Sequence, residues 1–300
     1  MHLLDEGLLE AVAAVAREGS FERAARVLHI TPSAVSQRVK LLEERLGAVL
    51  IVRGQPCTAT EIGARIRRHA ELVSVLVGEL RRDLPMLPQE GPDGSQASLR
   101  IAVNADSLGT WFIQAMAEFG REDGARLNLT LTDEDHTAEW LRRGHVLAAV
   151  TSVGTPIQGC RVRRLGSLTY VATASPAFVK RWFATGVSAT TLRHAPGLLF
   201  DSNDRLQEVW ARRVAHRDVA LPVHRIPSTQ AFVDAALAGV GWGMNPLSLA
   251  RPHLQTGALV ELLPDTRVDV PLYWQVARLK VPVLERLTRS VVRAAAAALR

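Results

Sequence analysis

The chain has 300 residues, of which 47% are hydrophobic, and its formal net charge is +6 at pH 7. This length can bury the cores of two or three domains, and no apolar run approaches the roughly 18 residues of a membrane span. The composition therefore excludes a disordered or membrane-spanning chain. The acidic start of the sequence, which lacks a basic signal segment, predicts a cytoplasmic protein.

Three short helices are predicted in the first 46 residues. Gly19 ends the first helix and Ser20 can cap the second, while Thr31 can cap the third with Pro32 at its first position, where a missing N–H costs nothing. The apolar stripes that predict the three helices are Leu4, Leu8, Val12 and Val15, then Phe21, Ala24, Ala25 and Leu28, then Val35, Val39, Leu42 and Leu46. Three short helices in this arrangement are typical of a small helical domain.

The third helix has a polar face opposite its apolar stripe. Serine and glutamine side chains can hydrogen-bond base edges in a major groove, and arginine and lysine can neutralise phosphates. Residues 20 to 68 hold nine arginines or lysines against four glutamates, an excess that suits a polyanion. We therefore predict DNA binding through this face and its flanks; the alternative is a solvated face on an ordinary helical bundle. The predicted DNA-binding residues here are Ser20, Thr31, Pro32, Ser33, Ser36, Gln37, Arg38 and Lys40.

A wing and a long helix are predicted next. Two short β-favouring pieces flank the turn at 53–56, which places Arg53 to contact the DNA backbone or minor groove. Thr60 can then cap a helix that runs to about residue 84, with apolar residues that alternate by four and three. This alternation predicts a dimer interface, with packing on its own domain as the alternative. The predicted interface residues are Ile62, Ile66, Val73, Leu76 and Leu80, with His69 as a polar residue among them.

The stretch SFERAARVLHITPSAVSQRVKLLEERLGAVLIVR, followed by the helix from Thr60, resembles the winged helix-turn-helix of LysR-type transcriptional regulators. Two later stretches, VNADSLGTWF and DVPLYWQVARL, resemble the ArgP/LysG branch of that family. The branch implies a regulator of amino-acid export or metabolism genes with a basic amino acid, lysine or arginine, as effector. The wing departs from the family pattern, because LIVRGQP stands where many members have a phenylalanine and a longer basic turn.

The domain organisation follows from a change of pattern near residue 99. The stretch 85–98 is rich in proline, glycine and polar residues and predicts a hinge. After it, strands alternate with helices, which predicts an α/β fold with a parallel sheet. We expect a winged helix-turn-helix at 1–59, a dimerisation helix at 60–84 and an effector domain at 99–300. The resemblance implies that this domain has the two lobes of a type 2 periplasmic-binding protein: lobe I about 99–160 and 265–300, lobe II about 161–264, with crossings near 152–165 and 263–270.

The predicted effector site lies where strands end. Backbone N–H groups after the first strand, with the hydroxyls of Ser107 and Thr110, can receive an α-carboxylate without a cation. Asp106 could cap the helix or contact the effector's ammonium group. A basic side chain needs a carboxylate partner, which Asp133, Glu134 and Asp135 or Asp201 and Asp204 could supply; each group could also be a solvated loop. The predicted effector-binding residues are Asn104, Asp106, Ser107, Thr110, Asp135, Thr151, Asp201 and Thr229.

No pattern in the chain predicts an enzyme. It contains no GxSxG, no HExxH and no phosphate-binding P-loop. Cys57 and Cys160 lie far apart and the nine histidines are scattered, so we expect no disulfide, metal or cofactor. The sequence therefore predicts a homodimeric or homotetrameric regulator that binds double-stranded DNA, with RNA polymerase as a possible further partner and no membrane. The alternative is a small-molecule binding or transport protein with a helical dimerisation module and no operator.

Overall fold

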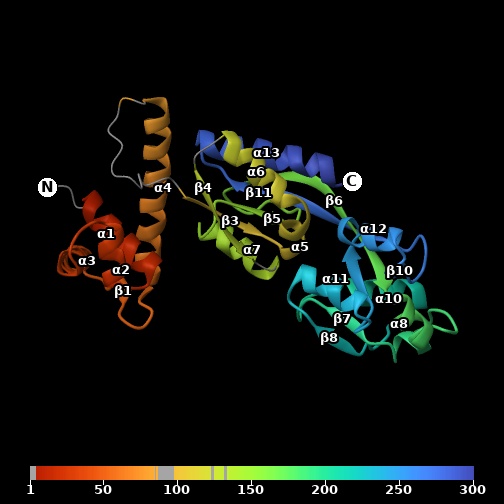
Figure 1. Ribbon diagram of the computed structural model, residues 1–300. Helices are drawn as coiled ribbons and strands as arrows, with labels where there is room; N and C mark the ends of the chain where they lie inside the picture. The colour runs from red at the N-terminus through yellow and green to blue at the C-terminus, as the bar shows by residue number, and fades with distance from the viewer. Residues whose placement is uncertain (1–4, 85, 87–97, 123–124, 132–133) are drawn as a thin grey trace. The chain divides into compact units, whose positions relative to one another are not determined.

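The computed structural model describes residues 5–84, 86, 98–122, 125–131 and 134–300, which fall into two compact units (Figure 1). One unit is formed chiefly by the chain up to Leu99, the other chiefly by the chain from Arg100 on. Most of the predicted hinge at 85–98 lies outside the described residues, and its last residue, Ser98, begins strand β3.

The first unit begins with three helices, as predicted: α1 (Glu6–Glu18), α2 (Phe21–Val27) and α3 (Pro32–Leu46). The predicted caps are confirmed, because the side chains of Ser20 and Thr31 accept the backbone N–H of Arg23 and Ala34, respectively. The core draws on all three helices and the segment after them, through Leu8, Leu9, Val12, Val15, Ala24, Ala25, Val35, Val39, Leu42, Leu50 and Ile51.

The wing is a two-stranded antiparallel ribbon, which confirms the two predicted β pieces. Strands β1 (Ile51–Val52) and β2 (Thr58–Ala59) pair with Ile51 opposite Ala59. The Thr60 side chain then caps α4 (Glu61–Asp83) and also donates to the carbonyl of Val49 at 2.8 Å. The cap thus ties the long helix to the wing.

Helix α4 packs against α1 with one face and leaves another face uncovered within the protomer. Ile66 is half-buried and packs against the core of its own domain, as does Ala70 one turn later on the same face. Its place in a dimer interface stays a prediction. Ile62, Leu76 and Leu80 are exposed and Val73 is half-buried, so these four remain available to a partner.

The second unit is built around a seven-stranded sheet in the order β10-β6-β11-β5-β3-β4, with β9 also on β6. The sequence predicts a parallel sheet, and β3 and β5 do pair in parallel, with Ile101 opposite Ala148. The pairs β10–β6, β11–β5, β11–β6 and β6–β9 are antiparallel, so the sheet is mixed and the prediction is wrong for these pairs. The first lobe contains β3 (Ser98–Val103), α5 (Ala105–Ser107), η1 (Leu108–Phe112), α6 (Ile113–Glu122), β4 (Arg126–Leu131), α7 (Glu134–Arg142), β5 (Ala148–Thr151) and α13 (Pro282–Ala298).

The second lobe has a small core of its own around Leu198, Phe232, Val233, Ala236 and Leu259. Strands β7 and β8 pair in parallel, while β9 and β10 pair antiparallel with the far end of β6. The elements are α8 (Pro176–Trp182), α9 (Ala189–Leu192), β7 (Gly197–Leu199), α10 (Leu206–Ala215), β8 (Val223–Arg225), α11 (Thr229–Leu237), β9 (Gly243–Pro246), α12 (Leu247–Gln255) and β10 (Val260–Glu261).

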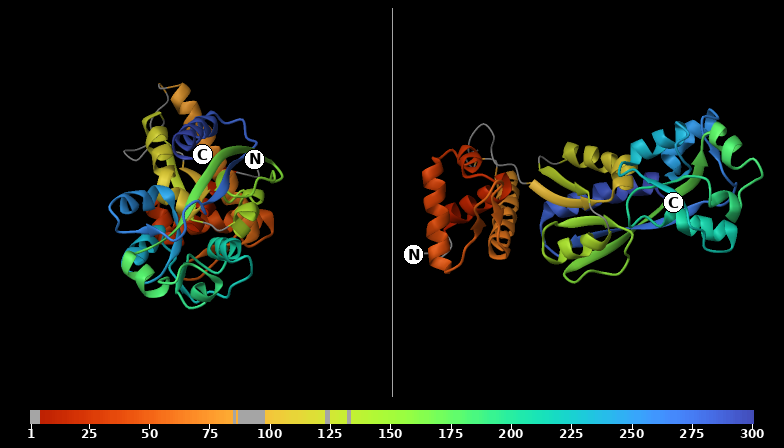
Figure 2. Two further views of the ribbon diagram at one scale, coloured as in Figure 1. Left: turned by 90° about the vertical axis from the view of Figure 1, so that its right-hand side faces the viewer. Right: turned by 90° about the horizontal axis from the view of Figure 1, so that it is seen from below.

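Two long strands, β6 (Cys160–Ala174) and β11 (Val268–Ala277), run side by side from one lobe into the other (Figure 2). Their register shifts between Leu272 and Tyr273, opposite Gly166, whose φ of 134° suits glycine. The sequence predicts crossings that are separate from the lobes. In the structure the crossings are parts of β6 and β11, and each of these strands extends into both lobes. We propose that the lobes meet near Gly166 and Leu272.

Candidate functional site

The polar face of α3 points away from the domain core. Val35, Val39 and Leu42 are buried beneath it, while Ser33, Gln37 and Lys40 are exposed and Ser36 is half-buried. Because the opposite face of α3 packs against α1 and α2, the helix holds these side chains in fixed positions. Such a helix can enter a major groove and present hydrogen-bonding groups to base edges.

Several of the predicted DNA-binding side chains have contacts within the domain. The Arg38 guanidinium lies near the first turn of α1, where a Cβ built on Gly7 would come within 3.5 Å of its Nη1. The Ser20 hydroxyl donates to Glu22 at 2.5 Å, and this hydrogen bond is the main cause that lowers the pKa of the Glu22 carboxyl. Lys40 points outward and its Nζ lies 3.6 Å from Glu44, one turn along α3.

The position of the wing depends on Glu43, a residue that sequence reasoning missed. Its Oε1 accepts the backbone N–H groups of Leu50 at 2.8 Å and Ile51 at 3.3 Å, so the carboxylate joins α3 to the first wing strand. Arg53 stacks over the Phe21 ring at 5.5 Å from the centroid and remains exposed. An acidic residue on a DNA-binding helix gives no sequence signal of this structural use.

The segment after β3 begins with a short helical turn, and its cap is Asn104. The Asn104 side chain accepts the N–H of Ser107 at 3.2 Å, so the alternative in which Asp106 caps this helix is wrong. The Thr110 hydroxyl donates to the Asp106 carbonyl at 2.5 Å, as threonine often does inside a helix, so that proton is already used. Ser107 is fully buried, and its hydroxyl has no hydrogen-bond partner among the described residues.

The Asp106 side chain is bound by two hydroxyl groups of the second lobe. Thr229, at the start of α11, donates to Oδ1 at 2.7 Å, and Tyr170, in the far part of β6, donates to Oδ2 at 2.6 Å. The structure therefore brings together Asp106 and Thr229, both predicted, with Tyr170, which was not. No local pattern marks Tyr170, because its partner is 64 residues away along the chain.

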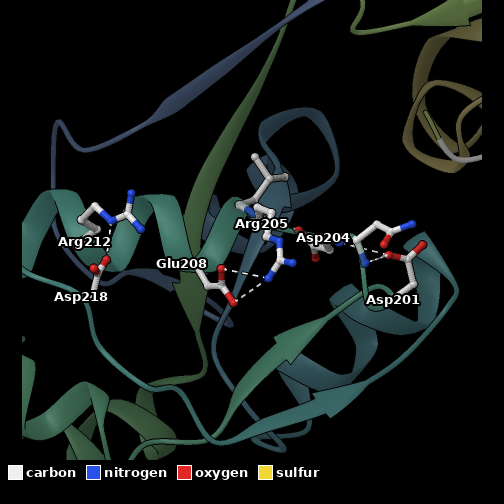
Figure 3. A network of polar contacts seen from close by, with 8 residues as sticks. Asp201, Asp204, Arg205, Glu208, Arg212 and Asp218 are labelled. Carbon is white, nitrogen blue, oxygen red and sulfur yellow. Dashed lines mark hydrogen bonds and ion pairs between the residues drawn. The ribbon is translucent and has the colours of Figure 1, made fainter. Parts of the chain in front are cut away.

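Asp201 and Asp204 lie in a tight turn before α10 (Figure 3). Asp201 accepts the N–H groups of Asn203 and Asp204 at 2.7 and 3.0 Å, and Asp204 accepts those of Phe200 and Leu206, each at 3.0 Å. Neither aspartate is a loosely solvated loop residue, because each organises the turn.

Asp204 is affected electrostatically by a carboxylate from each lobe, Asp106 and Asp201. Burial raises the pKa of the Asp204 carboxyl, and the charges of Asp106 and Asp201 raise that pKa further. The neighbouring arginines, Arg205 and Arg212, are each paired with another carboxylate (Figure 3). Within the described part of the chain, none of the three aspartates has a lysine or arginine partner.

Thr151 ends β5 and begins a loop that Gln275 organises. Thr151 is buried and accepts the N–H of Val153 at 3.1 Å. The Gln275 side chain donates to the carbonyls of Val153 and Thr155 at 2.9 and 3.0 Å and accepts the N–H of Ile157 at 3.0 Å. The side chain of Asp135, on α7, lies outside the described part of the structure, as does Asp133.

The described residues contain no group of three or more histidine, cysteine, aspartate or glutamate side chains placed to hold a metal ion. None of the described helices is long and apolar enough to cross a membrane.

Comparison with known proteins gives two family matches that together cover most of the chain. Residues 7–64 match the model of the bacterial regulatory helix-turn-helix protein, lysR family, and residues 92–298 match the LysR substrate binding domain. The HTH-type transcriptional regulator LysG of Mycobacterium tuberculosis is 42% identical, over 99% of this chain and 95% of its own.

Two solved structures share the fold over the whole chain. The crystal structure of ArgP from Mycobacterium tuberculosis matches with a TM-score of 0.79 and 40% identity, covering 99% of each chain. Full-length LysG from Corynebacterium glutamicum with bound effector Arg matches with a TM-score of 0.70 and 38% identity, covering 99% of this chain and 100% of that one.

Proposed function

The chain belongs to the LysR family of bacterial helix-turn-helix regulators, and from this premise we propose that it controls transcription in response to a basic amino acid, arginine or lysine. It is a DNA-binding transcriptional regulator and not an enzyme. Family membership also sets aside the alternative of a transport protein with no operator.

The observation that carries the effector proposal is the group of three aspartates from two lobes. The charges of Asp106 and Asp201 act unfavourably on the half-buried Asp204 carboxylate, and carboxylates that share a site without a cation are unfavourable. A guanidinium or ammonium group placed among them supplies the missing charge with strong, charge-assisted hydrogen bonds. The bound Arg in the Corynebacterium glutamicum relative supports the same chemistry.

The rest of the effector is an α-amino acid whose carboxylate needs a donor. We assign that role to the buried Ser107 hydroxyl, which has no hydrogen-bond partner among the described residues. Asn104, Thr110 and Thr151 hold the backbone around the site, since each forms a hydrogen bond with a main-chain group.

On the DNA side, the exposed face of α3 reads base edges and the wing contacts the backbone. Ser33, Ser36 and Gln37 supply hydrogen bonds, while Lys40 and Arg53 supply phosphate contacts. We place the dimer contact on the uncovered face of α4 and expect a two-fold-related operator near genes for amino-acid export or metabolism. The protein acts in the cytoplasm as a homodimer or homotetramer, with RNA polymerase as a further partner.

The test of the effector proposal is thermal unfolding of the purified protein with each amino acid. Arginine or lysine should raise the melting temperature, because a ligand of the folded state stabilises it. Citrulline, which has nearly the shape of arginine without its charge, is the matched control and should have little effect. If arginine and lysine have no effect, the effector proposal is wrong, and binding of operator DNA still tests the regulator separately.

A further inference from the structure

Asp106 joins the two lobes through its carboxylate. Oδ1 accepts the Thr229 hydroxyl at 2.7 Å and Oδ2 accepts the Tyr170 hydroxyl at 2.6 Å. Asp106 follows β3 in the first lobe, whereas both donors belong to parts of the second lobe. Two donors on different elements leave the carboxylate one orientation in which both hydrogen bonds form.

The main chain on either side of Asp106 is held as well. Thr110 donates to the Asp106 carbonyl at 2.5 Å, and Asn104 caps the turn. At Gly109, in the π-helical turn η1, an added Cβ would lie 3.3 Å from the Thr229 Cγ2, so the Gly109 backbone packs closely against the Thr229 side chain of the second lobe. These hydrogen bonds therefore fix the position of the Asp106 main chain.

Both donors are shielded from water. Tyr170 is 4% exposed and Thr229 is 8% exposed. Hydrogen bonds from hydroxyls to a carboxylate are stronger in such surroundings than at an open surface. Each carboxylate oxygen also keeps a free lone-pair direction, so a cation can still bind while the hydroxyls stay in place.

We propose that Tyr170 and Thr229 are positioning residues that aim the Asp106 carboxylate at the effector and clasp the two lobes together. This inference rests on the proposed function, because it assigns Asp106 to the effector's cationic group. The clasp favours the arrangement of the lobes in which all three aspartates surround the ligand. Without it, the competent arrangement is less populated, and the apparent affinity falls in proportion.

The test compares arginine affinity, measured by calorimetry, in Tyr170→Phe, Thr229→Val and Thr229→Ser. Each of the first two variants should weaken binding roughly tenfold, the lower end for loss of a hydrogen bond to a charged group. Thr229→Ser keeps the hydroxyl and should stay within about twofold of the wild type. Unchanged or tighter binding in both Tyr170→Phe and Thr229→Val would overturn the proposal.

The matched control is Thr169→Val. Thr169 neighbours Tyr170 on β6, and its hydroxyl donates to the Asp269 carboxylate at 2.5 Å, but neither group contacts Asp106. This variant loses the same kind of hydrogen bond and should bind arginine as the wild type does. A tenfold loss here as well would show that any disturbance of β6 weakens binding, which would also overturn the clasp.

A second measurement needs no effector and separates this inference from the proposed function. Spin labels at Gln114 on α6 and Ser248 on α12, both exposed, report the distance between the lobes. In the ligand-free protein, Tyr170→Phe and Thr229→Val should broaden or lengthen the distribution of that distance. If the wild-type protein binds neither arginine nor lysine, the proposed function fails, and these distances alone test the clasp. An unchanged distance distribution in both variants overturns the clasp.

Discussion

At the scale of single residues, Asp204 predicts how folding stability and arginine binding depend on pH. Its pKa is raised by burial and by the charges of Asp106 and Asp201, so in the folded protein the carboxyl takes up a proton at a higher pH than in the unfolded chain. Acidification through that range therefore stabilises the folded state, and it should weaken arginine binding because the carboxyl loses its charge. Asp204→Asn should weaken arginine binding at neutral pH by roughly tenfold or more and flatten this pH dependence. Calorimetry across a pH series checks both; an equal pH dependence in the variant would contradict the assignment.

Two neighbouring residues on α3 should differ in what they contribute to DNA binding. Gln37→Ala removes a group that can read a base edge, so it should cost about 1–3 kcal/mol of discrimination between operator and unrelated DNA. Lys40→Ala removes a phosphate contact, so it should weaken binding to all sequences similarly and reduce the slope of log affinity against log salt by about 1. Fluorescence anisotropy with both DNAs over a salt series checks this. An unchanged sequence preference in Gln37→Ala would tell against its role.

At the scale of elements, the absence of a side chain at Gly63 allows the first turn of α4 to pack closely against the backbone of Leu50, just before the wing. A Cβ at this position would lie 2.0 Å from the Leu50 carbonyl oxygen, and that clash is with backbone, which cannot rotate away. Gly63→Ala should destabilise the N-terminal unit by about 1–3 kcal/mol, as overpacking does. Gly120→Ala on α6 is the control, because a Cβ there meets nothing within 4 Å. Urea unfolding measures both variants, and an unaffected Gly63→Ala protein would contradict the tight junction.

The loop between β5 and β6 depends in the same way on Gln275. Its side chain satisfies two carbonyls and one N–H of that loop and is 0% exposed. Gln275→Ala leaves these groups without partners and should cost about 3 kcal/mol or more. Gln230→Ala, which removes an exposed hydrogen bond within α11, should cost less than about 0.5 kcal/mol. Thermal unfolding compares the two; similar losses would show that the Gln275 contacts contribute little.

At the scale of the whole molecule, the prediction concerns how two copies associate. Leu76 and Leu80 are 52% and 51% exposed on the uncovered face of α4. Charges at both positions, in Leu76→Glu with Leu80→Glu, should convert the proposed dimer to monomer, because burial of unpaired carboxylates is costly. Light scattering after size exclusion measures the mass, and Val209→Glu, at an exposed apolar residue of α10, should leave it unchanged. A dimer that survives the double variant would place the interface elsewhere.

Local signals were enough to predict much of this protein. The caps at Ser20, Thr31 and Thr60 and the apolar spacing of the first helices act over a few residues, so they can be read directly from the chain. The same holds for the family, whose motifs are contiguous. These features depend on neighbours within about one or two turns of backbone.

The tertiary structure decided what local signals cannot specify. Tyr170 and Thr229 reach Asp106 from 64 and 123 residues away, and Gln275 reaches its loop from about as far. Ile66 shares the spacing of its neighbours on α4, yet it packs inward because α1 happens to cover that side. The sequence by itself determined the helices of the N-terminal unit, their caps and the kind of protein. Packing between distant segments decided which side chains meet, because hydrogen bonds and burial depend on distance in space and not along the chain.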